Sequence, residues 1–101
     1  MQTETSAPVL PSRQFDLIAK ALADPRRMAL LASIASDREY SCHKLCIEFP
    51  VSKGTISHHM KELVRAGLIQ SRREGQYRFY TVRREVLAAY TAELMRRTAP
   101  L

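Results

Sequence analysis

The feature that most constrains the fold is the segment VSKGTISHHMKELVRAGLI, residues 51–69. Ser52 is a preferred helix N-cap residue and Gly67 suits the left-handed position that ends a helix, so we predict one helix over about residues 53–66. At 100° per residue, one sector of this helix is apolar and contains Ile56, Met60, Leu63 and Val64. The opposite row holds donors, cations and a glycine but no acid: Gly54, Ser57, His58, Lys61 and Arg65. A solvated helix face normally mixes both signs of charge, so this row indicates a surface for an anionic partner.

A basic hairpin, SRREGQYRFYTV, follows this helix. Residues 68–73 and 77–82 are predicted strands on either side of Glu74 and Gly75, a dipeptide that favours positive φ. Three arginines belong to the hairpin: Arg72, Arg73 and Arg78. A helix with a polar outward row followed by a basic hairpin is typical of a recognition helix that enters a DNA groove and a wing that contacts the flanking backbone.

The net charge is concentrated in the second half of the chain. Residues 1–50 hold six basic and six acidic side chains, whereas residues 51–101 hold ten basic and four acidic ones, which accounts for the net charge of +6. Such a surface attracts a polyanion, because each neutralised phosphate releases condensed counterions. Nucleic acid is therefore the expected partner, and the alternative is a basic surface that serves only solubility.

Composition sets further bounds. A chain of 101 residues with 46% hydrophobic content is expected to form one small domain with a thin core, which dimerisation would stabilise. No stretch approaches the length of a membrane span and the first residues have no signal-peptide pattern, so we expect a cytoplasmic protein without a membrane partner. The two cysteines, Cys42 and Cys46, do not form a secreted disulfide framework and fit a reducing compartment.

Before the recognition helix, three more helices are predicted. Residues 1–12 are expected to form a flexible tail and residues 13–98 the domain. The helix over residues 13–23 is apolar on two sides, one containing Phe15, Ile18, Ala19 and Leu22 and the other Leu17 and Ala21. Asp24 and Pro25 start a second helix that ends around Ser36, with a buried face of Met28, Leu31, Ile34 and Ala35. After a polar loop, residues 37–40, Ser41 caps a short helix over residues 42–48.

The short helix, the turn at residues 49–51 and the recognition helix form a helix-turn-helix. Residues 83–98 return to helical spacing. The predicted fold is therefore mainly α with a small β-hairpin, a winged helix-turn-helix of order α-α-α-α-β-β-α. The first and last helices are expected to meet a second subunit through the apolar side chains Phe15, Leu17, Ile18, Leu87, Tyr90 and Leu94.

The motifs ALADPRRMALL, VSKGTISHHMKELVRAGLI and RREGQYRFY occur in order and at the spacing of a known family. Over residues 15–94 the chain resembles the arsenical-resistance-repressor (ArsR/SmtB) family of winged helix-turn-helix regulators. The resemblance implies a homodimer that binds double-stranded operator DNA and represses transcription until a signal releases it. It places the base-reading residues at Lys53, Gly54, Thr55, Ser57 and His58 and the wing at residues 72–78. It assigns no inducer.

The signal-sensing positions differ from those of the family. Arsenic-sensing relatives begin the helix before the turn with cysteine-x-cysteine-aspartate-leucine-cysteine, and these positions read Ser41, Cys42, His43, Lys44, Leu45 and Cys46 here. A soft-metal site needs about three thiolates, and only the last cysteine matches. The zinc-sensing relatives use aspartate and histidine on the last helix, where this chain has no histidine. We therefore expect no bound metal and no cofactor.

The two thiols suggest another signal. Cys42 and Cys46 lie four residues apart, with Cα atoms about 6 Å apart along a helix, so a disulfide would have to unwind part of that helix. Unwinding would disturb the support of the recognition helix, as a redox-sensing repressor requires. Metal binding by Cys42, His43 and Cys46 is the alternative, and packing without a sensory role is the simplest interpretation.

The remaining histidine of the recognition helix, His59, is expected to be structural and hydrogen-bonded to neighbouring backbone.

Other classes of function are less consistent with the sequence. The chain has no glycine-rich phosphate loop and no nucleophile with an acid–base partner, so an enzyme is not expected. An architectural or RNA-binding winged-helix module without a signal input is the alternative function, and sequence-specific operator binding would distinguish the two. A protein-interaction domain that lost DNA binding is opposed by the acid-free helix face.

Overall fold

A computed structural model describes residues 9–100 of the chain. Its elements are α1 (Ser12–Leu22), α2 (Pro25–Ala35), β1 (Tyr40–Ser41), α3 (Cys42–Glu48), α4 (Lys53–Arg65), β2 (Ile69–Glu74), β3 (Tyr77–Val82) and α5 (Arg84–Arg97). The predicted winged helix-turn-helix order is confirmed, with β1 as an additional strand. Most of the expected tail, residues 1–12, lies outside the described residues, and Ser12 already belongs to α1.

Side-chain caps start three of the helices where the sequence predicts them. The carboxylate of Asp24 accepts a hydrogen bond of 2.8 Å from the backbone N–H of Arg26. The hydroxyl of Ser41 accepts one of 3.0 Å from Lys44 N–H, and the hydroxyl of Ser52 begins α4. Each cap satisfies a donor that the first turn of a helix leaves unpaired.

Two glycines end elements with positive φ. Gly67 has φ 83° and follows the last turn of α4, and Gly75 has φ 62° in the hairpin. Because Glu74 pairs with Tyr77, the two-residue turn consists of Gly75 and Gln76, one residue later than the predicted dipeptide.

The strand β1 corrects the prediction of a polar loop over residues 37–40. Tyr40 pairs with Tyr80, and Ser41 with Phe79, in an antiparallel arrangement that makes a three-stranded sheet of order β1-β3-β2. The Tyr40 ring is buried, and its hydroxyl donates a 2.6 Å hydrogen bond to the carboxylate of Glu48 at the end of α3. Tyr40 therefore connects the sheet to the helix that precedes the recognition helix.

The core lies between the helices and the inner face of the sheet. Its fully buried side chains are Ile18, Leu30, Ile34, Leu45, Ile56, Met60, Leu63, Leu68 and Ile69. For two residues, the prediction that they lie in the core is wrong. Met28 is 44% exposed and Val64 is 39% exposed. Met28 lies about 200° around α2 from the buried Leu30, so the inward face of this helix is centred on Leu30 and Ile34 instead.

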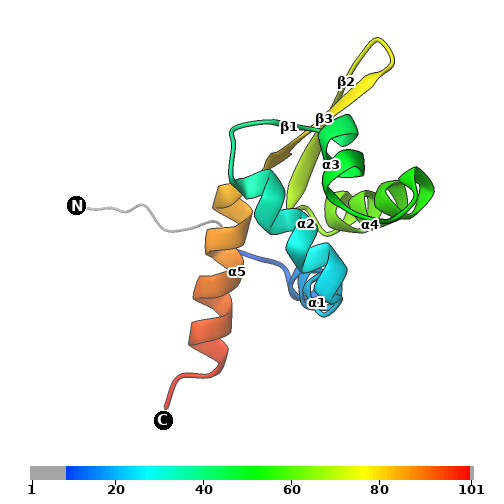
Figure 1. Ribbon diagram of the computed structural model, residues 1–101. Coiled ribbons are helices and arrows are strands. Elements are labelled where there is room, and N and C mark those ends of the chain that lie inside the picture. Colours follow the sequence, from blue (N-terminus) through cyan, green and yellow to red (C-terminus); the bar gives the residue numbers. More distant parts are fainter. Residues whose placement is uncertain (1–8, 101) are drawn as a thin grey trace.

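The recognition helix and the last helix lie on different sides of the molecule. Figure 1 shows α4 and the projecting β2–β3 hairpin on one side and α5 on the other, with α1 and α2 between them. In residues 9–100, no helix is both long and apolar enough to cross a bilayer. The fold thus separates the surface expected to meet DNA from the helices expected to meet a second subunit.

Candidate nucleic-acid interface

The recognition helix α4 presents the predicted polar row to the outside. Ser52 caps it by accepting a 3.1 Å hydrogen bond from Thr55 N–H, and the two hydroxyls are 3.0 Å apart. The opposite side is anchored in the core by Ile56, Met60 and Leu63. Ser57 is half-buried, and the other predicted contact residues on this helix are exposed: Lys53, Gly54, Thr55, His58, Lys61 and Arg65. This row contains donors and cations only, which matches phosphate oxygens and the acceptors of base edges.

Contacts from α1 and α2 hold α4 in place. At its C-terminal end, the side-chain amide of Gln14 donates a 3.2 Å hydrogen bond to the carbonyl of Ala66. On its flank, Nδ1 of His59 lies 3.5 Å from the guanidinium of Arg27, which is 3.9 Å from the carboxylate of Asp24. These contacts fix the helix relative to the rest of the domain.

His59 is a structural histidine, as predicted, but its partner differs from the expected backbone. The ring faces Arg27, and burial lowers the pKa of His59 while Asp24 opposes that shift. The imidazole is therefore neutral at neutral pH, and Nδ1 can accept a hydrogen bond from the arginine.

The wing arginines divide into two kinds. Arg72 is held by the carboxylate of Glu39 through two hydrogen bonds, 2.9 Å from Nε and 2.8 Å from one terminal nitrogen. Its other terminal nitrogen donates a 2.6 Å bond to Glu74, and its guanidinium lies 4.6 Å from the centre of the Phe79 ring. The bond to Arg72 lowers the pKa of Glu39. Arg72 thus connects the hairpin to the loop before β1, and its predicted phosphate contact would require these ion pairs to open.

Arg73 and Arg78 face the recognition helix instead. They line, together with Lys53 and Ser57 from α4, a hollow of about 520 Å³ between α3, α4 and the hairpin. Arg78 also donates a 2.8 Å hydrogen bond to the hydroxyl of Ser71. The structure therefore places two of the three predicted wing cations beside the N-terminal half of α4.

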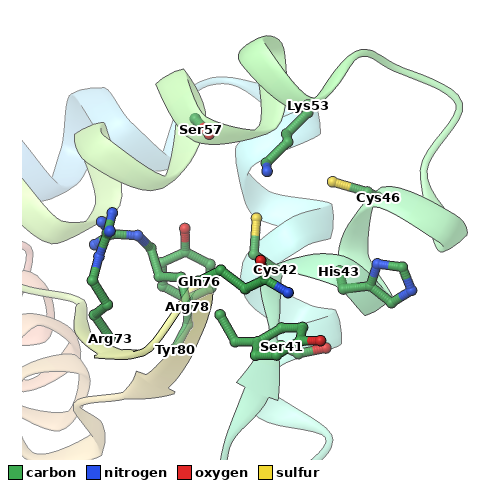
Figure 2. Close-up of a pocket in the computed structure, with 11 residues that line it drawn as sticks. Ser41, Cys42, His43, Cys46, Lys53, Ser57, Arg73, Gln76, Arg78 and Tyr80 are labelled. Atoms are coloured by element: carbon green, nitrogen blue, oxygen red, sulfur yellow. The ribbon is translucent and has the colours of Figure 1, made fainter.

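Both cysteines lie on the wall of this hollow. Figure 2 shows the sulfur atoms of Cys42 and Cys46 directed toward the space into which the Lys53 amine points. Cys42 is buried, whereas Cys46 is partly exposed and is a free thiol like its neighbour. Burial raises the pKa of the Cys46 thiol, and its contact with Cys42 raises it further. Cys46 is consequently a neutral thiol at neutral pH, which slows its reaction with oxidants.

His43, the third ligand of the alternative metal site, does not lie beside the two thiols. The ring of His43 points away from the two sulfur atoms in Figure 2. Among residues 9–100, no group of three or more histidine, cysteine or acidic side chains is arranged to hold a metal ion.

The proposed subunit interface on α1 and α5 needs one correction. Ile18 is 0% exposed and belongs to the core of its own chain, so it has no surface to offer a partner. Phe15 and Tyr90 are half-buried against each other with ring centres 5.0 Å apart, and the guanidinium of Arg97 lies 3.9 Å from the Phe15 ring centre. Leu17 and Leu87 are half-buried, whereas Leu94 is 41% exposed and its neighbour Met95 is 71% exposed.

Comparison with known proteins decides the family. The family model described as Helix-turn-helix domain matches residues 22–72. The arsenical resistance operon repressor of Staphylococcus xylosus is 34% identical over 80 residues, which covers 74% of this chain and 71% of the repressor. The chain belongs to the ArsR/SmtB family of winged helix-turn-helix transcriptional regulators. This ArsR-family regulator is therefore a DNA-binding protein of a non-enzymatic class.

Solved structures agree with this assignment. An ArsR-like transcriptional regulator from Rhodococcus superposes with a TM-score of 0.77 at 25% identity, covering 86% of this chain and 81% of that one. HlyU from Vibrio cholerae superposes with a TM-score of 0.68 at 31% identity, covering 88% and 96%. HlyU of Vibrio cholerae is named a transcriptional activator, so similarity to this ArsR-family regulator extends to both repressors and an activator.

Sequence reasoning missed two residues that position the candidate interface of this ArsR-family regulator. Gln14 and Glu39 each contact a partner more than thirty residues away, Ala66 and Arg72 respectively. Neither belongs to a local pattern, because an amide or a carboxylate in a polar stretch has the same appearance whether it is solvated or paired across the fold.

Proposed function

We propose that the protein is a homodimeric repressor that reads an inverted-repeat operator through α4 and contacts the flanking backbone with the wing. The observation that carries this proposal is the outward row of α4, which holds donors and cations without an acid. Beside it, the hairpin presents Arg73 and Arg78, which have no carboxylate partner among residues 9–100. Base edges and phosphates offer the complementary acceptors. Such a protein acts in the compartment that holds the DNA.

Selection of bound DNA from random duplexes tests the proposal. Two recognition helices related by a two-fold axis enter successive major grooves, so the selected sequences should contain half-sites about one helical turn apart. Recovery of unrelated sequences, with equal affinity for any duplex, would contradict it and would indicate an architectural binding module. Placement of the selected site over or upstream of a promoter then distinguishes repression from activation.

We further propose that the pair Cys42 and Cys46 releases the operator on oxidation. The support for this proposal is their position, since both thiols lie on α3, which packs against α4. A disulfide reagent such as oxidised glutathione would accept the two electrons of the two thiols and leave as two reduced molecules. The intramolecular disulfide would require part of α3 to unwind.

Operator binding before and after treatment with oxidised glutathione tests the thiol proposal. Affinity should fall on oxidation and return with a reductant, and Cys42→Ser or Cys46→Ser should abolish the response while leaving the affinity of the reduced protein unchanged. Because the pKa of Cys46 is raised, the reaction should accelerate as the pH rises above the ordinary thiol range of about 8.5. Unchanged DNA binding by a protein whose mass confirms the disulfide would reject this signal.

A further inference from the structure

The hollow between α3, α4 and the hairpin is lined by several cations and by no carboxylate. Three permanent cations line it, Lys53 from α4 and Arg73 and Arg78 from the wing, and no aspartate or glutamate belongs to its wall. The rest of the lining consists of the two cysteines, His43, and five residues with hydroxyl or amide donors: Ser41, Ser57, Tyr77, Tyr80 and Gln76. Among residues 9–100, no carboxylate lies within salt-bridge distance of these three cations.

The cationic side chains of the lining come from two separate elements. Figure 2 shows the Lys53 amine pointing from α4 into the space beside the two sulfur atoms, while the guanidinium groups of Arg73 and Arg78, which are cross-strand partners in the hairpin, lie together on another part of the wall. A second, smaller hollow of about 230 Å³ continues along α4 and shares Ser57, Arg78 and Tyr80 with the first. Arg73 and Arg78 are cross-strand neighbours, and like charges held near one another without a counter-charge repel, so an anion that enters beside them lowers the free energy of this arrangement.

We propose that this hollow binds a small phosphate-bearing molecule that competes with DNA. Arginine forks match phosphate oxygens, the lysine adds a point charge, and the surrounding hydroxyls can donate to the remaining oxygens. A volume of about 520 Å³ lies in the range of small-molecule sites and exceeds the size of orthophosphate. The ligand class is therefore a pyrophosphate or a small polar phosphomonoester.

The site also explains how such a ligand would act on the regulator. Lys53, Ser57, Arg73 and Arg78 are proposed DNA contacts, so an anion that occupies them removes them from the duplex. This competition rests on the proposed function, whereas anion binding itself does not. A backbone phosphate of DNA has the same chemistry, and the binding test is for this reason made first without DNA.

Isothermal titration of the DNA-free protein with pyrophosphate, at constant ionic strength and with orthophosphate for comparison, tests the site. We expect saturable binding of pyrophosphate that weakens about tenfold in Lys53→Gln and in Arg73→Gln, as the loss of one charged hydrogen bond predicts. The matched control is Arg65→Gln, an exposed cation of the same helix that does not line the hollow; it should bind pyrophosphate like the wild type. Absence of saturable binding, or equal losses in all three variants, would overturn the proposal.

Alkylation of Cys46 supplies a second measurement that does not depend on heat. In Cys42→Ser protein, iodoacetamide reacts with the single remaining thiol, which lies on the wall of the hollow. Pyrophosphate should slow the alkylation of Cys46 in Cys42→Ser protein, and it should have little effect on the rate when Arg73→Gln is added to this variant. An alkylation rate indifferent to pyrophosphate in both proteins would contradict occupancy of this space.

Competition with DNA separates the inference from the proposed function. Pyrophosphate should displace duplex DNA from wild-type protein more than an equal ionic strength of chloride does, and this excess should vanish in Arg73→Gln. If pyrophosphate binds as predicted but the protein binds no DNA, the proposed function fails and the anion site stands. If DNA binds and pyrophosphate does not, the anion site is rejected and the proposed function stands.

Discussion

Adjacent arginines in the wing illustrate how strongly a residue's role depends on distant neighbours. Arg72 is surrounded by the carboxylates of Glu39 and Glu74 and lies over the ring of Phe79. Arg73 alternates to the other side of the strand and lines the hollow beside α4. The two side chains have the same charge and are adjacent in the sequence. Only Arg73 can bind a phosphate without first breaking an ion pair with a carboxylate.

We therefore expect different effects from Arg72→Ala and Arg73→Ala. Arg73→Ala should weaken binding to all duplexes alike and lower the slope of log affinity against log salt by roughly one, because one phosphate contact is lost. Arg72→Ala should leave that slope near the wild-type value, and Glu39→Gln should resemble it. Salt titrations of the three variants measure both effects, and a slope reduced equally by Arg72→Ala would show that its pairs open on DNA.

At the scale of elements, helix caps, helix stops and the spacing of apolar residues predicted most of the fold. The strand that the sequence did not predict, β1, depends on pairing between residues that are distant in the chain. The caps at Asp24, Ser41 and Ser52 and the stop at Gly67 are local, and the helices start or end where these residues predicted. Strand β1 has only two residues and exists because Tyr40 pairs with Tyr80, forty positions along the chain. No periodic pattern can reveal so short a strand.

The same distinction applies to the candidate site. The outward row of α4 follows from helical spacing and was predicted, with Ser57 more covered than expected. The contacts of Glu39 and Gln14 depend on how loops and helices meet in three dimensions. Ile18 was assigned to the subunit interface because α1 is apolar on two sides, and sequence alone does not tell which of those sides faces the core.

The contact between Tyr40 and Glu48 leads to a prediction about pH. The carboxylate of Glu48 raises the pKa of Tyr40 to about 12, so the fold favours the protonated phenol. The resulting stability is complete below the unfolded pKa of about 10 and is lost as the pH rises through about 12.

Urea unfolding at several alkaline pH values measures this effect. Wild-type stability should fall between about pH 10 and pH 12, and Tyr40→Phe should be less stable at neutral pH but lose less over that interval. Glu48→Gln retains an acceptor without the charge, so its tyrosine should titrate at lower pH while neutral stability remains closer to wild type. Parallel pH profiles for wild type and Tyr40→Phe would show that this pair does not control the alkaline transition.

At the scale of the whole molecule, the fold places the proposed DNA contacts and the proposed subunit contacts on separate helices. The helix α5, which carries the exposed apolar residues Leu94 and Met95, lies on the other side of the molecule from α4. Phe15 and Tyr90 form the adjoining surface where α1 meets α5. A small domain gains stability by covering such a surface with a second copy, and the dimer in turn sets the distance between two recognition helices.

We expect Leu94→Glu to convert the dimer to a monomer, because a charge would be buried without a partner. The matched control is Ile47→Glu, which places the same charge on an apolar residue that is 71% exposed on α3; it should remain dimeric. Sedimentation velocity at micromolar concentration measures both. A monomeric wild type, or a Leu94→Glu variant that stays dimeric, would reject the proposed interface.

The central claim is that α4 supplies specificity and the wing supplies general affinity. Its most direct test is the ratio of affinities for a selected operator and a scrambled duplex, measured for wild type, His58→Ala and Arg73→Ala at one salt concentration. We predict that His58→Ala lowers this ratio by about tenfold, the value of a good base contact, and that Arg73→Ala leaves the ratio unchanged while weakening both affinities. An unchanged ratio in His58→Ala, or the same loss of ratio in both variants, would contradict the account.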